Sequence, residues 1–332
     1  GVNDARNNTS SIPDSSSVLS EYQWGDEKWE ATMDCIRDVY SPYDVEVTDV
    51  DPGTEVFHHE AILAGTPGEL GLMPNIGGIA PAGCAPLNNV ISFSFGNASF
   101  SGDGDPLQNC WTVAQESAHA FGLPNHVFNC LDPMTYLQGC GKKFFRNQSY
   151  GCGEFEPAPC NCSGATQNSH VELRTVFGDG VQPPPPTVSI LLPDADAQVE
   201  DNFVIFWDAQ DERLVDHSDL YINGSKYTEI PGHEYASRAD NYDTTAPSLP
   251  DGYIDIEIKA YNGLGSEAVS SVRVLKGSPC ADKGSCFEFQ ECNAGRCEYP
   301  AANSQLGDAC DIDFQCAEGV CGEVGDSKSC TN

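Results

Sequence analysis

The sequence predicts a multidomain protein in which an α+β domain is followed by an all-β sandwich and a small disulfide-rich tail. Before residue 180 a helical pattern and strand-like patterns occur, the proline run VQPPPP occupies 181–186, and the sixteen cysteines form two groups, eight before residue 163 and eight after residue 279. At 332 residues the chain can form two or three domains, each with a core. We therefore expect a flexible leader at 1–20, a first domain at 21–181, a polyproline linker at 182–186, a sandwich at 187–277 and a cysteine-rich module at 278–332.

Local patterns define the elements of the first domain. Residues 1–20 are rich in Asn, Ser and Asp, which is typical of a flexible leader. WEATMDCIRDVY at 29–40 carries apolar residues at intervals of three and four, so it predicts a helix with one buried face. VISFSF at 90–95 alternates as a strand does, and YDVEVTDV at 43–50 does so loosely. GGIAP at 77–81 is expected at a sheet edge, and VELRTVFGDG closes the domain.

The segment from 111 to 137 carries the chemistry, because QESAHAFGLPNH is followed there by DPMTY. It resembles the active-site segment of the metzincin zinc endopeptidases, HExxHxxGxxH with a later Met-turn, and here reads QExxHxxGxxNH. The resemblance covers 21 to about 180 and is specific only at 113–136. The resemblance implies a zincin-like α+β fold, with Glu116 as the general base and His119 as the second zinc ligand. It also implies that the chain turns out of the helix at Gly122 and that Met134 belongs to the Met-turn. Tyr136 matches the tyrosine that astacins and serralysins bring to the metal.

The chemistry explains this spacing. Positions 115 and 119 are four apart, so on a helix both side chains project from one face and reach a single ion. Zinc lowers the pKa of a bound water toward about 7, and the carboxylate of Glu116 then takes its proton. Gly122 permits a backbone direction that other residues adopt at a cost, which brings a third ligand to the metal.

Two positions depart from the family pattern. Gln115 stands where the first ligand His is expected, and a neutral amide is a poorer zinc donor than imidazole. The third ligand is expected at Asn125, but the histidine follows one residue later, at His126. His58 and His59 are the only other paired histidines, and nothing in the sequence places them near the helix.

These departures leave two functional hypotheses open. The first is a secreted zinc endopeptidase that hydrolyses a protein or peptide substrate. The second is an inactive pseudopeptidase that serves as an extracellular binding, adhesive or structural protein. The retained Glu116 favours the first hypothesis and the loss of a histidine at 115 favours the second. A simpler alternative is that QESAH is a polar turn of an ordinary helix with His119 as a hydrogen-bonded core residue.

The charge excludes some partners. Fifty acidic and sixteen basic residues give a net charge of −34, which repels nucleic acid and anionic membranes. A solvated surface adapted to a saline medium explains this charge, and calcium binding is the alternative. No apolar run approaches the length of a membrane span, so none is expected. The acidic clusters that could hold Ca²⁺, neither with EF-hand spacing, are Asp103 with Asp105, and Asp194 with Asp196, Glu200 and Asp201.

The cysteines and the second half of the chain indicate export. An even number of cysteines in two groups is typical of disulfides formed in an oxidising compartment, so the protein is expected to be secreted or displayed at a cell surface. The alternating runs after 186 resemble immunoglobulin-like or fibronectin III-like modules. In the tail, CFEFQECNAGRC and CDIDFQCAEGVC share the spacing Cx5CxxGxC, which predicts two small disulfide units. Disulfide connectivity and oligomeric state stay open.

Overall fold

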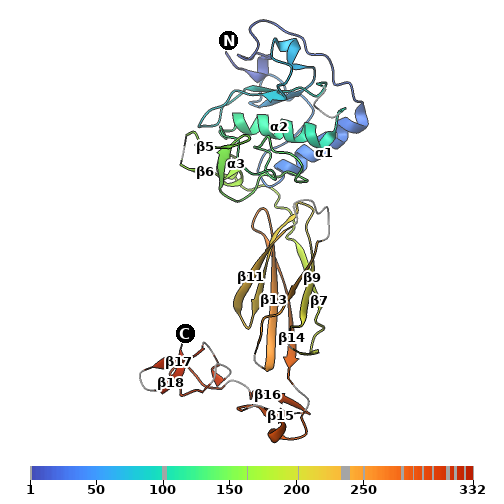
Figure 1. The fold of residues 1–332 in the computed structure, drawn as a ribbon. Coiled ribbons are helices and arrows are strands. Elements are labelled where there is room, and N and C mark those ends of the chain that lie inside the picture. Colours follow the sequence, from blue (N-terminus) through green and yellow to red (C-terminus); the bar gives the residue numbers. More distant parts are fainter. Residues whose placement is uncertain are drawn as a thin grey trace.

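The protein is mostly β, with few helices and several small sheets arranged in three consecutive bodies (Figure 1). The computed structural model describes residues 2–331 apart from 99–102, 163, 201, 233–239, 250, 278–279, 287, 294, 301–302, 312–314, 318–319 and 325–326. An N-terminal module that holds the helices α1, α2 and α3 lies above a β-sandwich, and the disulfide-rich tail lies at the far end of the sandwich.

The N-terminal module combines helices with a three-stranded sheet of order β1-β3-β2. β1 and β3 pair in parallel, while β2 pairs antiparallel with β3 and forms an edge of the sheet. The expected edge segment at 77–81 and the strand at 90–95 are thus confirmed. The elements are η1 Ala5–Asn7, α1 Asp26–Tyr40, β1 Glu60–Leu63, η2 Pro67–Leu70, β2 Gly78–Ile79, β3 Ile91–Ser94, α2 Pro106–Ala120, β4 Tyr150–Gly153, β5 Pro157–Ala158, β6 Thr166–Gln167 and α3 Ser169–Phe177.

Two expectations for this module are wrong. Residues 43–50 form no strand: Val45 and Val47 pack against the helical core, and this burial explains their alternation without a sheet partner. Residues 2–20 do not extend away as a flexible leader. Ala5 is buried there, and Ile12 and Leu19 pack against the core cluster that includes the β3 side chains. The apolar residues of this segment are too far apart to be recognised as a pattern.

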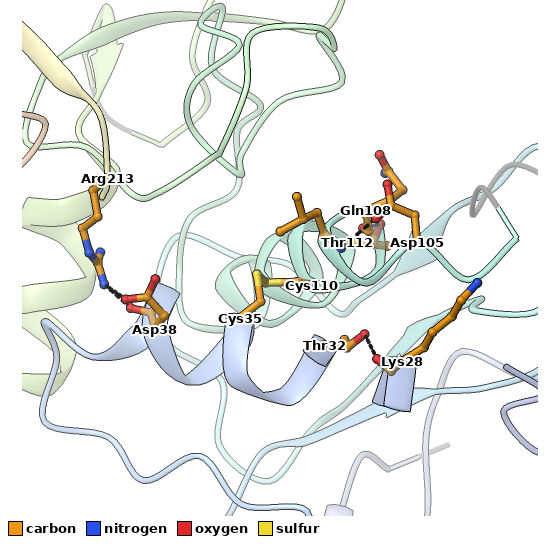
Figure 2. The surroundings of a disulfide bond; sticks show 10 residues. Lys28, Thr32, Cys35, Asp38, Asp105, Gln108, Cys110, Thr112 and Arg213 are labelled. Carbon is orange, nitrogen blue, oxygen red and sulfur yellow. Dashed lines mark hydrogen bonds and ion pairs between the residues drawn. A yellow bond between two sulfur atoms is a disulfide. The ribbon is translucent and has the colours of Figure 1, made fainter. Parts of the chain in front are cut away.

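α2 is anchored to α1 by covalent and polar bonds. The Cys35–Cys110 disulfide joins the two helices (Figure 2). One turn after Cys35, the Tyr40 hydroxyl lies 3.1 Å from the carbonyl oxygen of Ala114 and 2.6 Å from Ser117 Oγ. At its start, α2 is capped by the Asp105 carboxylate, which accepts from the backbone N–H of Leu107. The helix is therefore fixed along most of its length.

The second body is a two-sheet β-sandwich. One sheet has the order β11-β10-β13-β14-β8 and the other β12-β9-β7, and all neighbours are antiparallel except β8 and β14. Trp207 is fully buried in the core of this sandwich. The strands are β7 Thr187–Leu192, β8 Gln198–Val199, β9 Val204–Gln210, β10 Val215–Ile222, β11 Ser225–Pro231, β12 Asp240–Thr245, β13 Gly252–Asn262 and β14 Glu267–Lys276.

The sandwich contacts the N-terminal module directly. Arg213, before β10, is almost fully buried and bonds Asp38 Oδ1 near the end of α1 at 2.7 Å (Figure 2). Arg146 of the N-terminal module forms a buried ion pair with Asp216. Asp216 also accepts from Gln148 Nε2 at 2.6 Å. The proline segment at 181–186 has no regular secondary structure, but these contacts hold the two bodies together.

The tail consists of small hairpins closed by disulfides. β15 Glu291–Asn293 pairs with β16 Arg296–Glu298, and β17 Val320–Val324 pairs with β18 Ser327–Thr331. The first and third cysteines of each predicted repeat pair with each other, as Cys286–Cys297 and Cys310–Cys321. The middle cysteines pair outward, as Cys280–Cys292 and Cys316–Cys330. No cysteine is free, so the disulfide-rich tail is confirmed.

Candidate metal site

One face of α2 presents the predicted helix residues. Gln115, Glu116 and His119 are all buried, with exposed fractions of 9% or less. After Phe121 the chain leaves the helix at Gly122, whose φ of +102° lies in the left-handed region that favours glycine. The turn returns His126 to the helix, where its Nε2 lies 3.2 Å from His119 Nε2. The structure thus brings the two histidines together across seven residues of sequence.

The hydrogen bonds of the two histidines fix which nitrogens face each other. His119 Nδ1 lies 2.8 Å from the carbonyl oxygen of Leu123, which can only accept, so Nδ1 carries the proton. His126 Nδ1 lies 3.4 Å from a carboxylate oxygen of Glu154, which likewise accepts. Both Nε2 lone pairs of the neutral rings therefore point into the same space. Burial lowers the pKa of His119 to about 4 and also lowers the pKa of His126. Protonation of either ring is therefore disfavoured, and with it a proton held between the two Nε2 atoms.

This pair fits a zinc ion. Zn–N bonds of about 2.0–2.1 Å in a tetrahedral site place two ligand nitrogens about 3.3 Å apart, close to the observed 3.2 Å. A carboxylate or carbonyl partner on the remote ring nitrogen is the usual arrangement around zinc-bound histidine. Gln115, one turn before His119, has a buried amide nitrogen without a hydrogen-bond partner, so its amide is free to turn its oxygen toward an ion. With the two histidines, the Gln115 oxygen would make a donor set of two imidazoles and one neutral amide, which is weaker than three imidazoles.

Glu116 is held against the edge strand β2. A Cβ at Gly78 would lie 2.5 Å from Glu116 Cγ and 2.8 Å from Oε1, so only glycine leaves room for this carboxyl group. Burial raises the pKa of Glu116 to about 8, without a compensating cation or hydrogen bond. A carboxyl with a pKa near neutrality can both accept and return a proton, as a general acid–base group must.

Asn125, the other expected ligand, is not brought to the pair. Its Oδ1 accepts from the backbone N–H of Asn161 at 2.7 Å, and its Nδ2 donates to Gln167 Oε1 at 3.2 Å. Both ends of the amide are thus used in bridging neighbouring segments. The turn at Gly122 directs residue 126, not residue 125, toward the helix, so Asn125 is a structural residue.

Tyr136 lies beside His126, one member of the pair. Its ring is 4.1 Å from that of His126, and burial, with Glu116 and Glu154 nearby, raises the pKa of its hydroxyl to about 12. The buried Lys143 donates to the carbonyl oxygen of Leu137 at 2.7 Å, which ties down the loop that carries the tyrosine. Burial lowers the pKa of Lys143 to about 8.

The residues predicted as the Met-turn directly precede Tyr136 in the same segment. Met134 is fully buried, and its carbonyl oxygen accepts from the backbone N–H of Val127, next to His126. Asp132 accepts from the backbone N–H groups of Met134 and Arg146 and from Ser169 Oγ. The Met-turn is thereby bonded to the segment that carries one of the paired histidines.

The remaining candidates lie elsewhere. His59 Nε2 contacts Ser92 Oγ at 2.9 Å and its ring packs on Phe121, whereas His58 bonds the carbonyl of Val56. Of the acidic clusters considered for Ca²⁺, Asp201 lies outside the described residues, and Asp105 caps α2. The groups of three possible metal ligands found among the described residues include none of these acidic residues.

Two residues of the site, Glu154 and Gly78, were not among the predicted site residues. Glu154 follows His126 by 28 positions and approaches it only because β4 runs beside residues 126–128. Gly78 precedes Glu116 by 38 positions and meets it only through the packing of α2 on the sheet. Local spacing cannot reveal either contact, and a conspicuous Gly-Gly pair at 77–78 was the only hint.

Comparisons with known proteins assign no family. No family model matches the sequence, and no similar curated protein is found. Similar solved structures include fibronectin(III)-like modules of Clostridium thermocellum CbhA, at 20% identity and a TM-score of 0.22, where the match covers 27% of this chain and 46% of that one. An endo-β-1,4-mannanase from Thermotoga petrophila matches at 12% identity and a TM-score of 0.23, over 32% of this chain and 23% of the enzyme. A CARDB domain from Pyrococcus furiosus matches at 15% identity and a TM-score of 0.20, over 27% and 94% of the two chains. Similarities at these TM-scores carry no argument about fold or activity.

Proposed function

We propose that this protein is an exported, metzincin-like zinc endopeptidase with a zincin-like N-terminal domain and an atypical metal site formed by His119, His126 and Gln115. The single observation that carries the proposal is the pair of Nε2 atoms 3.2 Å apart, each on a ring whose Nδ1 is bonded elsewhere. Two facing lone pairs repel each other, and a bound cation removes that repulsion.

The side chains around the pair have the properties that peptide hydrolysis requires. Bound zinc would acidify a water and polarise the scissile carbonyl. Glu116, with its raised pKa, accepts a proton and returns it to the leaving amine. The Tyr136 hydroxyl, protonated at neutral pH, donates a hydrogen bond to the developing oxyanion. The edge strand β2 beside Glu116 offers backbone groups with which an extended substrate can pair.

Export is supported by the cysteines. All sixteen are paired, which is the state expected in an oxidising compartment. Among the residues that the structure describes, no helix is long and apolar enough to cross a membrane.

The first experiment measures the zinc content of the purified full chain by inductively coupled plasma mass spectrometry. We expect close to one zinc per chain in the wild type and in His58→Ala, since His58 is bonded to Val56 away from the pair. His119→Ala should lose the metal. Absence of zinc in the wild type after incubation with excess metal, or retention by His119→Ala, overturns the proposal.

Substitution at position 115 tests the ligand set. If Gln115 is a weakened version of a histidine ligand, Gln115→His raises zinc affinity and peptidase activity. If the site has been rebuilt around His126, the same change lowers both. No change in either zinc affinity or activity would count against a metal site at this helix.

The second candidate function is a pseudopeptidase that binds an extracellular protein. The neutral amide of Gln115 at a ligand position favours this candidate, since it weakens the metal site. Stoichiometric zinc without hydrolysis of any member of a broad peptide library would support it against the peptidase.

A further inference from the structure

A continuous row of aromatic rings leads from the candidate metal site to solvent. The centroid of the Tyr136 ring lies 4.1 Å from that of His126 and 6.0 Å from that of Phe155. Exposure rises along the row, from 15% of the His126 side chain to 40% for Tyr136 and 69% for Phe155. A single exposed phenylalanine needs no explanation, but a row of rings that starts at a site offers stacking faces to a ligand.

The outer ring of the row is carried on a rigid support. Phe155 lies in the turn between β4 and β5, which the Cys152–Cys160 disulfide closes. The backbone N–H of Gly153 donates to the carbonyl oxygen of His126 at 3.0 Å, so the hairpin is bonded to the candidate ligand itself. A fixed ring loses little freedom when a ligand stacks on it, which favours binding.

Two acidic residues adjoin Phe155 in the sequence of the turn. Glu154 and Glu156 adjoin Phe155 in the turn, and Glu154 contacts His126 while more than half of its side chain remains exposed. The chain as a whole has a net charge of −34. A cationic ligand is therefore attracted to this end of the site, whereas an acidic peptide is repelled.

We propose that the row formed by Tyr136 and Phe155, together with Glu156, is a binding subsite for a peptide in which an aromatic residue adjoins lysine or arginine. This inference rests on the proposed peptidase function in naming a peptide as the ligand, but binding at the subsite does not require hydrolysis. The aromatic side chain stacks on Phe155 and the cation pairs with Glu156. Stacking of this kind contributes about tenfold to affinity, and an exposed ion pair about two- to fivefold.

The test measures binding and hydrolysis separately. Fluorescent alanine-rich peptides that contain Phe-Lys, Ala-Lys or Phe-Glu are titrated into the full-length Glu116→Gln protein, and fluorescence anisotropy reports binding. We expect the Phe-Lys peptide to bind about tenfold more tightly than Ala-Lys. Phe155→Ala should remove this difference and Phe155→Trp should retain it. The matched control is Phe57→Ala, because Phe57 is 71% exposed but packs on Arg6 instead of Tyr136.

The charged part of the subsite has its own control. Glu156→Gln should reduce the preference for Phe-Lys over Phe-Glu, most clearly at low ionic strength, and leave the preference for Phe over Ala unchanged. An aromatic preference that persists in Phe155→Ala, or no preference in the parent protein, overturns the inference. If zinc-loaded wild type binds Phe-Lys peptides selectively but cleaves no peptide, the proposed peptidase function fails and the subsite stands. If it cleaves peptides but shows no preference for Phe-Lys, the proposed subsite fails and the proposed peptidase function stands.

Discussion

The buried ion pair between the two large bodies provides the sharpest test of the structure. Arg146 is 1% exposed and Asp216 14% exposed, so neither charge is well hydrated when the pair is broken. The Arg146 guanidinium is packed so closely that a Cβ at Gly263 would lie 2.7 Å from its central carbon. In Asp216→Asn the arginine keeps its charge in this confined space without its ion-pair partner. Removal of one partner from a buried pair costs about 3–5 kcal/mol, and the residual exposure of Asp216 places our expectation near 3 kcal/mol.

An exposed pair in the same sandwich serves as the control. Asp255 and Arg273 are bonded at 2.6 Å, but more than half of each side chain is exposed. Asp255→Asn should therefore cost less than about 1 kcal/mol. The assay is urea unfolding of the full chain with disulfides intact, followed by tryptophan fluorescence, with midpoints and slopes compared. Equal losses in the two variants would refute the conclusion that the Arg146–Asp216 contact is a buried bond between the bodies.

Two further predictions concern the site and its support. Gly78→Ala should lower the proposed peptidase activity by about 100-fold and leave zinc binding by the proposed site unchanged, because a Cβ 2.5 Å from Glu116 Cγ displaces the carboxyl group by about 1 Å. Gly151→Ala, in an exposed strand position with no atom within 4 Å, should retain activity, and full activity of Gly78→Ala would contradict the placement of Glu116. Burial raises the pKa of Asp132 from 3.8 to about 6. The folded state therefore binds the Asp132 proton more tightly than the unfolded state does, and this binding stabilises the fold below pH 4. The stabilisation is lost as the pH rises through 6. At about 1.4 kcal/mol per pKa unit the loss is about 3 kcal/mol, and urea unfolding between pH 4 and 6 should show it in the wild type but not in Asp132→Asn.

Periodic patterns in the sequence predicted the elements that bury one face. The helix at 29–40 and the strand at 90–95 were predicted because apolar residues repeat at the period of each structure. The same reasoning failed at 43–50, where Val45 and Val47 alternate but pack on the helical core without a strand partner. Alternating apolar residues indicate that one face of a segment is buried, but a segment can bury that face without belonging to a sheet.

The candidate site was predictable only where it is local in sequence. Glu116 and His119 follow from helical spacing, and Gly122 from the turn that it allows. The sequence could not decide between Asn125 and His126 as the residue facing the helix, since this depends on how one turn is closed. The outer contacts of the site come from segments 28 and 38 residues away, brought near by strand pairing and helix packing.

The disulfide pattern determines what a single proteolytic cut would do to this protein. A break between Cys35 and Cys110 leaves its two fragments tethered by their sulfur bond, and so does a break between Cys84 and Cys162. In the tail each unit closes on itself, and no disulfide joins Cys297 and earlier cysteines to Cys310 and later ones. A cut between 298 and 309 therefore releases the last unit with both of its bonds intact. A single cut in either of these ranges of the N-terminal module thus leaves the chain covalently connected, whereas a single cut in the tail can separate its last unit.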